Sequence, residues 1–571
     1  MRVVALLLIG FLAQQVRPGA TSTIRGVVLR SSTSTPVDKA VVELRTGKDP
    51  EPRVVTTTSN GRFEFLDVPS GSYQLTASRS GYLDTSFGQR GPSGSGRDLN
   101  VESGTTVDNL QLVMTATGAI SGRVFDDTGE PLAMVTVRAL KYSYADGERS
   151  LVEVGSQTTN DLGEFRLFWL PPGQYHLSAT PDGGVSGKMF HLTWEKGKMQ
   201  GAAVRLDTNS FLMSGVIGAK TQRTLVPVYY PGTTDPKFAA PVEVRSGADV
   251  RGIDFRLSRV ATRKVRGTII DGVTGQPSSQ GNLSLVPRDS PDGPLDHTSP
   301  SENGIFEFAS VRPGPYLIVA NATINSEGSD GRSAGGTTSV EVGQSDLNNV
   351  VVTLQPGIRI DGAIALEGLA TLPADIYPEI RLVRTGVPQN GNFDDFGSEY
   401  EDSSNTRFRL PNVLEGDYRL KWESAGALPP GVYLRSATFG PVDALNSTLH
   451  IDQRTRDRLQ IVLGANAGSL RGTVVDRARK PAPGVKVVLV PDAARRERND
   501  LYQTTVSDES GSFQFERIPP GDYFVFAWED VEDGVWRDAD FLRRHAGSGR
   551  PLHVVENGRN TVEVVAIPLG Q

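Results

Sequence analysis

The sequence predicts an all-β protein built from tandem antiparallel β-sandwiches. Three observations predict this fold. A strand with a central glycine recurs five times, a Gly-x-Tyr corner follows each copy at a similar distance, and alternating apolar and polar residues fill the space between the two marks. Because successive side chains of a strand point to opposite faces, this alternation is typical of strands with one buried face.

The opening strands divide the chain into units. Their central glycines are Gly26, Gly122, Gly267, Gly362 and Gly472. The distances between them are the size of domains rather than of solenoid repeats, since domains usually have 50 to about 250 residues. We therefore predict five sandwiches over residues 23–115, 118–259, 263–355, 357–464 and 467–571. The second carries a long insertion after Pro181, and the fourth is the most divergent.

A predicted hairpin follows the opening strand of each unit. Polar turns with glycine precede alternating apolar residues in SNGRFEF from Ser59, NDLGEFRL from Asn160, SENGIFEF from Ser301 and SDESGSFQF from Ser507. Glycine accepts the positive φ that a tight turn requires. The fourth unit has only SNTRFRL from Ser404, without glycine, so we expect a longer or bulged hairpin there.

The Gly-x-Tyr corners are predicted to be structural. Their tyrosines are Tyr73, Tyr175, Tyr316, Tyr418 and Tyr523. A tyrosine that follows a corner commonly buries its ring and bonds its hydroxyl to nearby backbone, as in immunoglobulin-like sandwiches. The alternative is a row of recognition residues. With the closing strands, each unit has roughly seven strands, and helix is expected only near residues 492–500 and 538–545.

The N-terminus predicts export. Arg2 precedes an apolar run over residues 3–13, and the small residues Gly19 and Ala20 precede polar sequence. This pattern is typical of a secretory signal peptide over residues 1–20, with a short buried strand or helix as the alternative. No second long apolar stretch follows, so we expect no membrane span after signal removal and a secreted, periplasmic or cell-surface location.

Composition excludes several kinds of function. The chain has no cysteine, which rules out disulfides, thiol catalysis and thiolate metal sites. Its 59 basic and 66 acidic residues give a net charge of −7, with no basic stripe. Nucleic-acid binders usually carry such a stripe, so we expect no nucleic-acid partner.

Three motifs together resemble the carboxypeptidase regulatory-like domain. They are SGRVFDDTGEPLAMVTV from Ser121, NDLGEFRL from Asn160 and LPPGQYHLSA from Leu170. The resemblance implies a seven-stranded transthyretin-like, or prealbumin-type, sandwich, similar in fold to starch-binding-like and collagen-adhesin B-type modules. It also implies an accessory role in a secreted bacterial protein, because in metallocarboxypeptidases this domain carries none of the catalytic residues.

Residues for catalysis are not recognisable. His553 and Glu556 match the H-x-x-E zinc-ligand pair of metallocarboxypeptidases, but no histidine follows Glu556 to complete the site. We therefore predict no enzyme activity, no catalytic residues and no cofactor. Calcium bound by loop carboxylates is the minority alternative. The acidic pairs that could serve it are Asp126-Asp127, Asp394-Asp395, Glu529-Asp530 and Glu532-Asp533.

The tryptophans supply the candidate ligand-binding residues. Trp169, Trp422 and Trp528 lie in or next to apolar strands and are predicted to be core. Trp194 and Trp536 lie in polar loops, where exposed rings could stack on sugars, so these two are the predicted site. The expected partner is a polysaccharide or a cell-envelope protein.

These observations predict a secreted, non-catalytic, multi-domain binding and spacer protein. Two alternatives from other classes stay open. The chain could be an accessory module of a peptidase or of an outer-membrane transport system, or it could be a hydrolase whose site the sequence does not reveal.

Overall fold

The structure is a computed structural model that describes residues 21–46, 51–144, 149–181, 193–195, 198–200, 223–288, 296–324, 332–372, 377–385, 395–401, 405–425 and 428–568. The chain divides into two compact units, Met1–Ala116 and Thr117–Gln571, which are described separately. Strands dominate the described residues, and α1 (Ala539–Arg544) is their one α-helix. The all-β prediction is confirmed. The predicted signal peptide, residues 1–20, lies outside the described residues.

Unit 1 holds sandwich 1. Its strands are β1 (Ser22–Arg30), β2 (Val41–Arg45), β3 (Arg53–Thr56), β4 (Arg62–Val68), β5 (Gly71–Ser78), β6 (Thr85–Ser86), β7 (Leu99–Val101) and β8 (Thr106–Met114). One sheet has the order β4-β1-β8, and the facing sheet has the order β3-β2-β5-β6, with β7 also paired to β5.

Unit 2 begins with sandwich 2. Its two sheets are formed by β9 (Gly118–Asp126), β10 (Val135–Ser143), β11 (Ser150–Thr158), β12 (Glu164–Leu170), β13 (Gly173–Pro181), β17 (Val228–Tyr229), β18 (Val242–Val244), β19 (Asp249–Val250) and β20 (Phe255–Leu257). The order is β12-β9-β19 in one sheet, with β20 on β9, and β11-β10-β13-β17 in the other, with β18 on β13. Outside them lie β14 (Thr193–Glu195), β15 (Lys198–Gln200), β16 (Arg223–Leu225), β21 (Arg259–Ala261) and the 3-10 helix η2 (Pro236–Phe238).

In sandwich 3 the strands form one continuous hydrogen-bonded sheet. They are β22 (Arg263–Asp271), β23 (Asn282–Pro287), β24 (Asp296–Thr298), β25 (Ile305–Val311), β26 (Gly314–Ile324), β27 (Arg332–Val342) and β28 (Leu347–Pro356). The order is β24-β23-β26-β27-β28-β22-β25. The layers join because the long β27 pairs with β26 along its length and with the end of β28 at Ala334 and Gly335.

Sandwich 4 has two sheets of unequal width. Its strands are β29 (Ile358–Glu367), β30 (Tyr377–Arg384), β31 (Asp395–Gly397), β32 (Glu399–Tyr400), β33 (Arg407–Val413), β34 (Gly416–Ala425), β35 (Tyr433–Phe439), β36 (Val442–Asp443), β37 (Leu449–Ile451) and β38 (Leu459–Gly464). The orders are β32-β33-β29-β38-β35-β36 and β31-β30-β34-β37. In the hairpin that has no turn glycine, Thr406 holds the glycine's position and the residue before it, Asn405, has φ 54°, which asparagine tolerates better than most residues. The rest of this turn, residues 402–404, lies outside the described residues.

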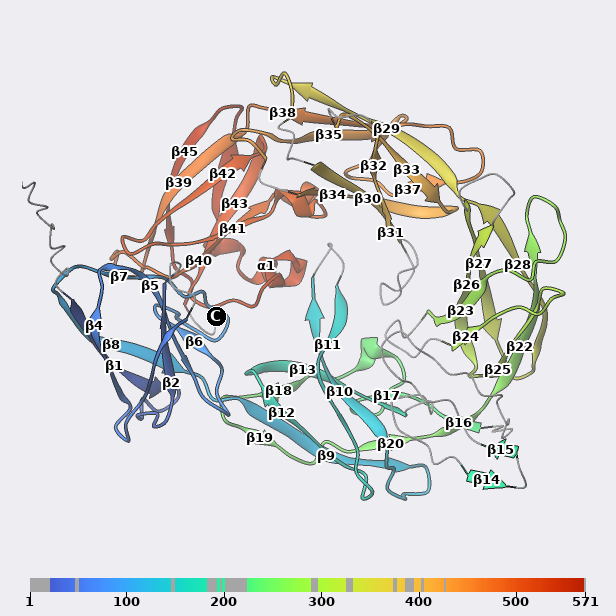
Figure 1. Ribbon diagram of the computed structural model, residues 1–571, viewed down its shortest axis with the longest axis horizontal. Coiled ribbons are helices and arrows are strands. Elements are labelled where there is room, and N and C mark those ends of the chain that lie inside the picture. Colours follow the sequence, from blue (N-terminus) through green and yellow to red (C-terminus); the bar gives the residue numbers. More distant parts are fainter. Residues whose placement is uncertain are drawn as a thin grey trace, which may run out of the picture. The chain divides into compact units, whose positions relative to one another are not determined.

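Sandwich 5 has a three-stranded and a four-stranded sheet, ordered β42-β39-β45 and β41-β40-β43-β44 (Figure 1). Its strands are β39 (Gly468–Val475), β40 (Lys486–Pro491), β41 (Gln503–Val506), β42 (Ser512–Ile518), β43 (Gly521–Trp528), β44 (Arg550–Val554) and β45 (Arg559–Val565). The predicted helical segment 538–545 contains α1, and the predicted segment 492–500 contains the 3-10 helix η3 (Ala493–Arg495) and the start of η4 (Asn499–Leu501). The 3-10 helices η5 (Val535–Arg537) and η6 (Ala546–Ser548) lie just outside the predicted segments.

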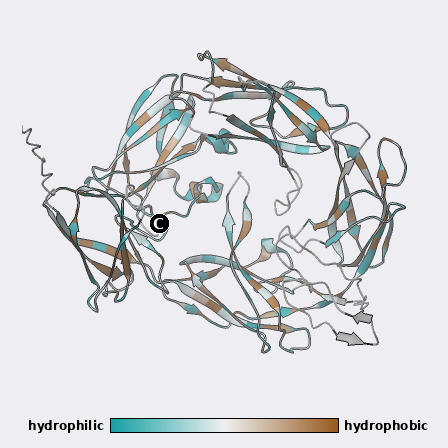
Figure 2. Ribbon diagram, in the orientation of Figure 1, coloured by the Kyte–Doolittle hydropathy of each residue, from teal (hydrophilic) through white to brown (hydrophobic). Residues whose placement is uncertain are grey.

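Each sandwich encloses its own hydrophobic core. Buried side chains of the described residues cluster separately within residues 24–114, 120–257, 265–354, 358–463 and 470–566. Brown and teal residues alternate along many strands in Figure 2, as expected when one strand face is buried. The burial of this apolar surface is the main force that stabilises each sandwich.

The opening glycine makes room for an aromatic ring. In four sandwiches a side chain at this glycine would collide with the phenylalanine opposite on the next strand of the sheet. A Cβ atom built on Gly26, for example, would lie 2.5 Å from Phe63 Cζ. The other three pairs are Gly267 with Phe306, Gly362 with Phe408 and Gly472 with Phe513. Glycine inside a strand often marks such a close approach. The opening glycine and the first hairpin phenylalanine are therefore in contact in these four sandwiches.

The pairing of the opening strand differs from the antiparallel prediction. β1 lies between β4, to which it is antiparallel, and the closing strand β8, to which it is parallel. Each of the other sandwiches repeats this arrangement. The chain crosses to the facing sheet and returns in the same direction before it closes, and parallel neighbours require such a crossover.

A β-bulge interrupts the second hairpin strand in every sandwich. In β12, Leu167 pairs with Ile120 but Leu170 pairs with Gly118, so β12 holds one residue more than β9 over this stretch. The same shift in register occurs opposite the openings of β1, β22, β29 and β39. A bulge leaves the extra residue unpaired and bends the strand.

Candidate functional site

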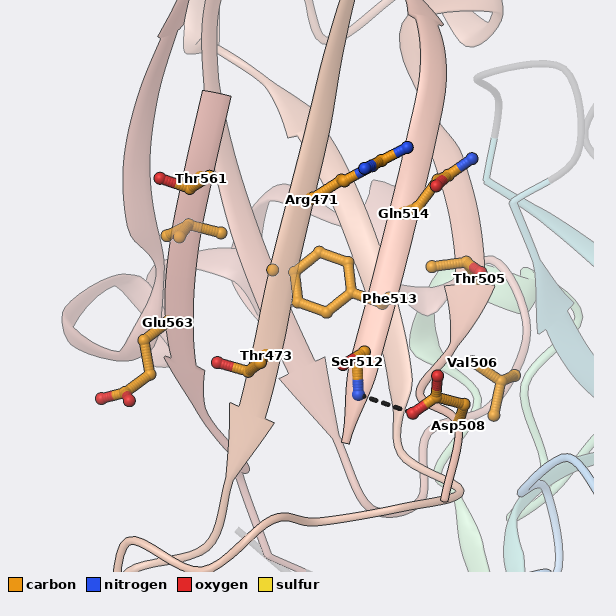
Figure 3. Close-up of a pocket in the computed structure, with 12 residues that line it drawn as sticks. Arg471, Thr473, Thr505, Val506, Asp508, Ser512, Phe513, Gln514, Thr561 and Glu563 are labelled. Carbon is orange, nitrogen blue, oxygen red and sulfur yellow. Dashed lines mark hydrogen bonds between the residues drawn. The ribbon is translucent and has the colours of Figure 1, made fainter. Parts of the chain in front are cut away.

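An open groove of about 790 Å³ lies on sandwich 5 (Figure 3). Its lining comes from β39, β42, β45 and the end of β41. The lining residues are Arg471, Gly472, Thr473, Thr505, Val506, Asp508, Ser512, Phe513, Gln514, Thr561, Val562 and Glu563. Arg471 and Gln514 lie at one end of the groove, and Val506 and Asp508 lie at the other.

The chemistry of this groove suits polar binding. Its hydroxyl, amide and guanidinium groups can donate and accept hydrogen bonds, and its lining contains no histidine. The Asp508 carboxylate is already engaged, since it accepts from Ser510 Oγ at 2.7 Å and from the backbone N–H of Ser512 at 2.8 Å. The Ser510 hydroxyl, helped by these backbone groups, lowers the pKa of Asp508. Asp508 therefore builds the turn and is a poor candidate for a general base.

The predicted corner tyrosines are all buried. In the described structure, four of them donate a hydrogen bond to the carbonyl oxygen four residues earlier. The pairs are Tyr73 to Pro69 at 2.9 Å, Tyr175 to Pro171 at 2.5 Å, Tyr418 to Leu414 at 2.8 Å and Tyr523 to Pro519 at 2.8 Å. Burial raises the pKa of Tyr523 to about 12. A ring buried in this way cannot form part of a recognition row.

His553 of the H-x-x-E motif forms a cross-strand pair, and Glu556 lies 3.5 Å from Arg435. His553 Nδ1 lies 2.7 Å from the Asp522 carboxylate on the neighbouring strand. Sandwich 4 repeats the pair, with His450 Nδ1 2.9 Å from Asp417. The hydrogen bond that His450 donates to the Asp417 carboxylate raises the pKa of His450. Both histidines are exposed.

Three of the four acidic pairs lie wholly within the described residues, and the side chains of Asp394-Asp395 lie outside them. Within the part of the chain that the structure describes, no three His, Asp or Glu side chains gather in a way that could hold a metal ion. Asp126 is buried, but its carboxylate accepts from Thr128 Oγ1 at 2.6 Å and pairs with Arg259 at 3.0 Å. The hydrogen bonds from Thr128, with those from backbone groups and the charge of Arg259, lower the pKa of Asp126 to about 2.

Trp536 is not the exposed ring that the sequence predicted. It lies in η5 and is only 5% exposed. Its neighbours form a second core on the outer face of the sheet that contains β40, together with Val488, Phe526 and Trp528. Residues 529–549 cover this face. Because many of their side chains are polar, the sequence suggested an exposed loop. The premise of an accessible ring is therefore wrong for Trp536.

The other predicted site residue, Trp194, lies in β14, opposite Met199 of β15. Its side chain is outside the described residues. The prediction that its ring binds a ligand stays a prediction.

Trp169 shows the opposite outcome to Trp536. It was predicted to be core, but it is 62% exposed, while Trp528 is buried and Trp422 is partly buried as predicted. Trp169 is the second residue of the bulge in β12 and has φ 57°. Phe168 beside it is 44% exposed, and the two rings meet edge to face with centroids 5.0 Å apart.

The repeats contained the signal that would have placed Trp169 at the surface. In each hairpin strand the buried positions are spaced by two and then by three residues, as in Phe63, Phe65 and Val68 of sandwich 1. The two residues skipped by the longer step are Leu66-Asp67, Phe168-Trp169, Ala309-Ser310, Pro411-Asn412 and Glu516-Arg517. Only sandwich 2 has two aromatic residues there. The two aromatics therefore stand out only when the five repeats are aligned.

The described residues contain no helix long and apolar enough to span a membrane.

Comparison with known proteins finds one domain family in three of the five sandwiches. Residues 23–115, 119–207 and 469–531 match the carboxypeptidase regulatory-like domain. A 254-residue stretch is 23% identical to Colossin-A of Dictyostelium discoideum. The match covers 41% of this chain and 2% of Colossin-A.

Among solved structures, a streptococcal ancillary pilin is similar with 12% identity, a TM-score of 0.21 and coverage of 58% of this chain and 99% of the pilin. Two B repeat units of the collagen binding protein of Staphylococcus aureus are similar with 12% identity, a TM-score of 0.12 and coverage of 78% and 100%. TM-scores this low carry no inference about function.

Proposed function

Because the chain carries carboxypeptidase regulatory-like domains in tandem, we propose that it is a non-catalytic, multi-domain binding and spacer protein at the bacterial cell surface or in the periplasm. The observation that carries the proposal is the repetition itself. One fold with a separate core recurs along the chain, and three of the repeats match the domain directly. A fold of this kind specifies architecture, so the function has to come from the places where the repeats differ.

The partner that fits is a polysaccharide or a protein of the cell envelope. The groove of sandwich 5 is open and lined mainly by hydrogen-bonding side chains, which suits an extended polar ligand better than a small molecule enclosed in an apolar pocket. The net charge of −7 argues against a nucleic acid. Export is supported by the predicted signal peptide over residues 1–20.

Location and binding can be tested together. We expect the full-length protein to reach the envelope or medium of a bacterial host and to lose residues 1–20 there, as measured by fractionation and N-terminal sequencing. We also expect the processed protein to sediment with isolated bacterial envelopes. Retention in the cytoplasm, or failure to sediment with any envelope fraction, would contradict the proposal.

A second test concerns catalysis. The purified protein should show no turnover of peptide or ester substrates, with or without a chelator. Turnover that a chelator abolishes would show that the protein is a metal-dependent hydrolase and would overturn the non-catalytic assignment.

A further inference from the structure

We propose that Phe168, Trp169 and Gly155, together called the β12 platform, form a saccharide-binding site on sandwich 2. This inference rests on the proposed binding function and assigns it a location and a ligand class. The site combines an exposed indole, a second ring that supports it and a gap where sandwiches 1 and 5 carry a polar side chain.

The gap becomes visible when the sandwiches are aligned by strand pairing. In sandwich 1, Arg53 of β3 lies opposite Leu44 and donates to the carbonyl oxygens of Leu66 and Asp67, the two bulge residues, at 2.8 and 3.0 Å. In sandwich 5, Gln503 of β41 lies opposite Leu489 and donates to the carbonyl oxygen of Arg517 at 3.2 Å. A side chain from the edge strand therefore closes the bulge in both.

Gly155 occupies this position in sandwich 2, opposite Ala139 of β10. A buried hydroxyl residue four places further along confirms the alignment. These residues are Thr57, Thr159 and Ser507. A Cβ atom built on Gly155 would lie 3.7 Å from Leu170 Cδ2, so β11 runs directly beside the end of β12. Because glycine has no side chain, the carbonyl oxygens of Phe168 and Trp169 lack the donor that their counterparts have.

The residue type of Trp169 is unusual for its position in the bulge. Its φ of 57° lies in the left-handed region, which asparagine and aspartate enter more readily than an aromatic residue. The equivalent residues Asp67, Asn412 and Arg517 have φ values of 54°, 61° and 57°, so the bulge itself imposes this conformation. The other three are polar, whereas Trp169 places a large apolar side chain in solvent, where it gains little stabilisation from burial. The edge-to-face contact with Phe168 holds the indole in place.

The chemistry of the platform matches a sugar ring. The C–H face of a pyranose can stack on an exposed indole, and its hydroxyl groups can donate to the two bulge carbonyls. Arg166 lies two residues before Phe168, so both side chains point to the same side of β12, about 7 Å apart along the strand. Arg166 also lies 3.9 Å from Asp249 of β19. An apolar peptide side chain would cover the ring but leave these polar groups without partners.

The test uses the full-length chain with two probes, cellohexaose and maltohexaose, which present glucose in β-1,4 and α-1,4 linkage. Binding is measured by isothermal titration calorimetry. We expect the wild type to bind at least one probe and Trp169→Asn to bind it at least tenfold more weakly. Asparagine occupies the same bulge position with the same backbone conformation at Asn412, so this variant should fold.

Two further variants separate the site from general effects. Gly155→Gln installs the donor that Gln503 provides in sandwich 5, and it should weaken binding about threefold or more by occupying the bulge carbonyls. Leu66→Ala removes an exposed apolar side chain, 55% exposed, from the equivalent bulge of sandwich 1, and it should bind like the wild type. Circular dichroism confirms that each variant is folded.

Equal binding by Trp169→Asn and the wild type would overturn the inference, as would binding of neither probe by the wild type at millimolar concentration. Sedimentation with bacterial envelopes, measured on the same preparations, distinguishes the two proposals. If the wild type sediments with envelopes but binds neither probe, only the saccharide site fails. If it does neither, the binding function fails as well.

Discussion

Trp169 of sandwich 2 was predicted to be buried and is exposed, whereas Trp536 of sandwich 5 was predicted to be exposed and is buried. Trp169 sits in the apolar run FRLFWL and is 62% exposed, whereas Trp536 sits among acidic and basic residues and is 5% exposed. A bulge in β12 turns the first ring outward. The covering segment of residues 529–549 buries the second against the outer face of β40.

The difference shows how a repeated sandwich acquires individual surfaces. Sandwich 5 covers its sheet with an insertion, so every residue of β40 is buried, including those that face away from the main core. Sandwich 2 leaves the edges β11 and β12 open, with Val152, Val154, Phe168 and Trp169 exposed. Exposed apolar residues that gather in one place, rather than singly, mark interaction surfaces.

The largest change in stability is expected when Trp536 is replaced. Trp536→Ala should lower the stability of sandwich 5 by about 3–5 kcal/mol, because it opens a cavity in the second core. Hydrogen exchange of the β40 amides is the measurement of choice, since unfolding of a multi-domain chain is not two-state. Trp169→Ala is the matched control and should stay within roughly 0.5 kcal/mol of the wild type in β12. Equal effects of the two substitutions would remove the distinction between the regions.

A pair of glycines provides the second test. Gly472→Ala should destabilise sandwich 5 by about 1–3 kcal/mol, because the new methyl group collides with the Phe513 ring. Gly155→Ala should instead stabilise sandwich 2 by about 0.5–1 kcal/mol, since its Cβ meets only Leu170 at an ordinary distance. Hydrogen exchange of β39 and β11 reports the two changes. A loss of protection in β11 would show that Gly155 is structural and would weaken the β12 platform.

The third test concerns the corner tyrosine, which sandwiches 2 and 5 share. Tyr523→Phe and Tyr175→Phe each remove a corner hydrogen bond and leave a carbonyl oxygen without this donor. We expect similar losses, about 1–2 kcal/mol, in sandwiches 5 and 2. Hydrogen exchange of β43 and β13 measures them. A loss confined to one sandwich would mean that the corner is not a common structural element.

A still smaller change is expected when the strain at Trp169 is relieved. Trp169→Asn should leave sandwich 2 as stable as before or raise its stability by up to about 1 kcal/mol, because a left-handed conformation costs most residues about 1–2 kcal/mol and asparagine less. Hydrogen exchange of β12 and β9 reports the change. Destabilisation by more than 1 kcal/mol would mean that the indole packs better than its exposure indicates.

The smallest change in stability concerns His450, an exposed side chain paired with Asp417 across two strands. Its pKa is raised by the hydrogen bond that it donates to the Asp417 carboxylate. The ion pair therefore stabilises sandwich 4 below the unfolded pKa of about 6.5, and this stabilisation is lost as pH rises through the folded pKa. Asp417→Asn should return the pKa of His450 toward its ordinary value, measured by NMR titration. Because the pair is exposed, the change in stability should be slight. An unchanged titration would show that the pair is not formed in solution.

Sequence reasoning succeeded where the pattern was local and repeated. The opening glycines, hairpin turns and corner tyrosines each occupy equivalent positions in the structure because their roles depend on neighbours a few residues away or on the adjacent strand. It failed to predict that the closing strand runs parallel to the opening strand, and it mispredicted the burial of Trp169 and Trp536. Those depend on how the chain crosses between sheets and on which segment covers a face.

The sequence by itself determined the repeated sandwich, because period-two hydrophobicity and turn chemistry are written into every unit. Only the tertiary structure decided which tryptophan rings are exposed to solvent. A single extra residue in β12 reverses which side chains face outward, and one covering segment turns an outer sheet face into a core. Neither event changes the local composition from which burial was predicted.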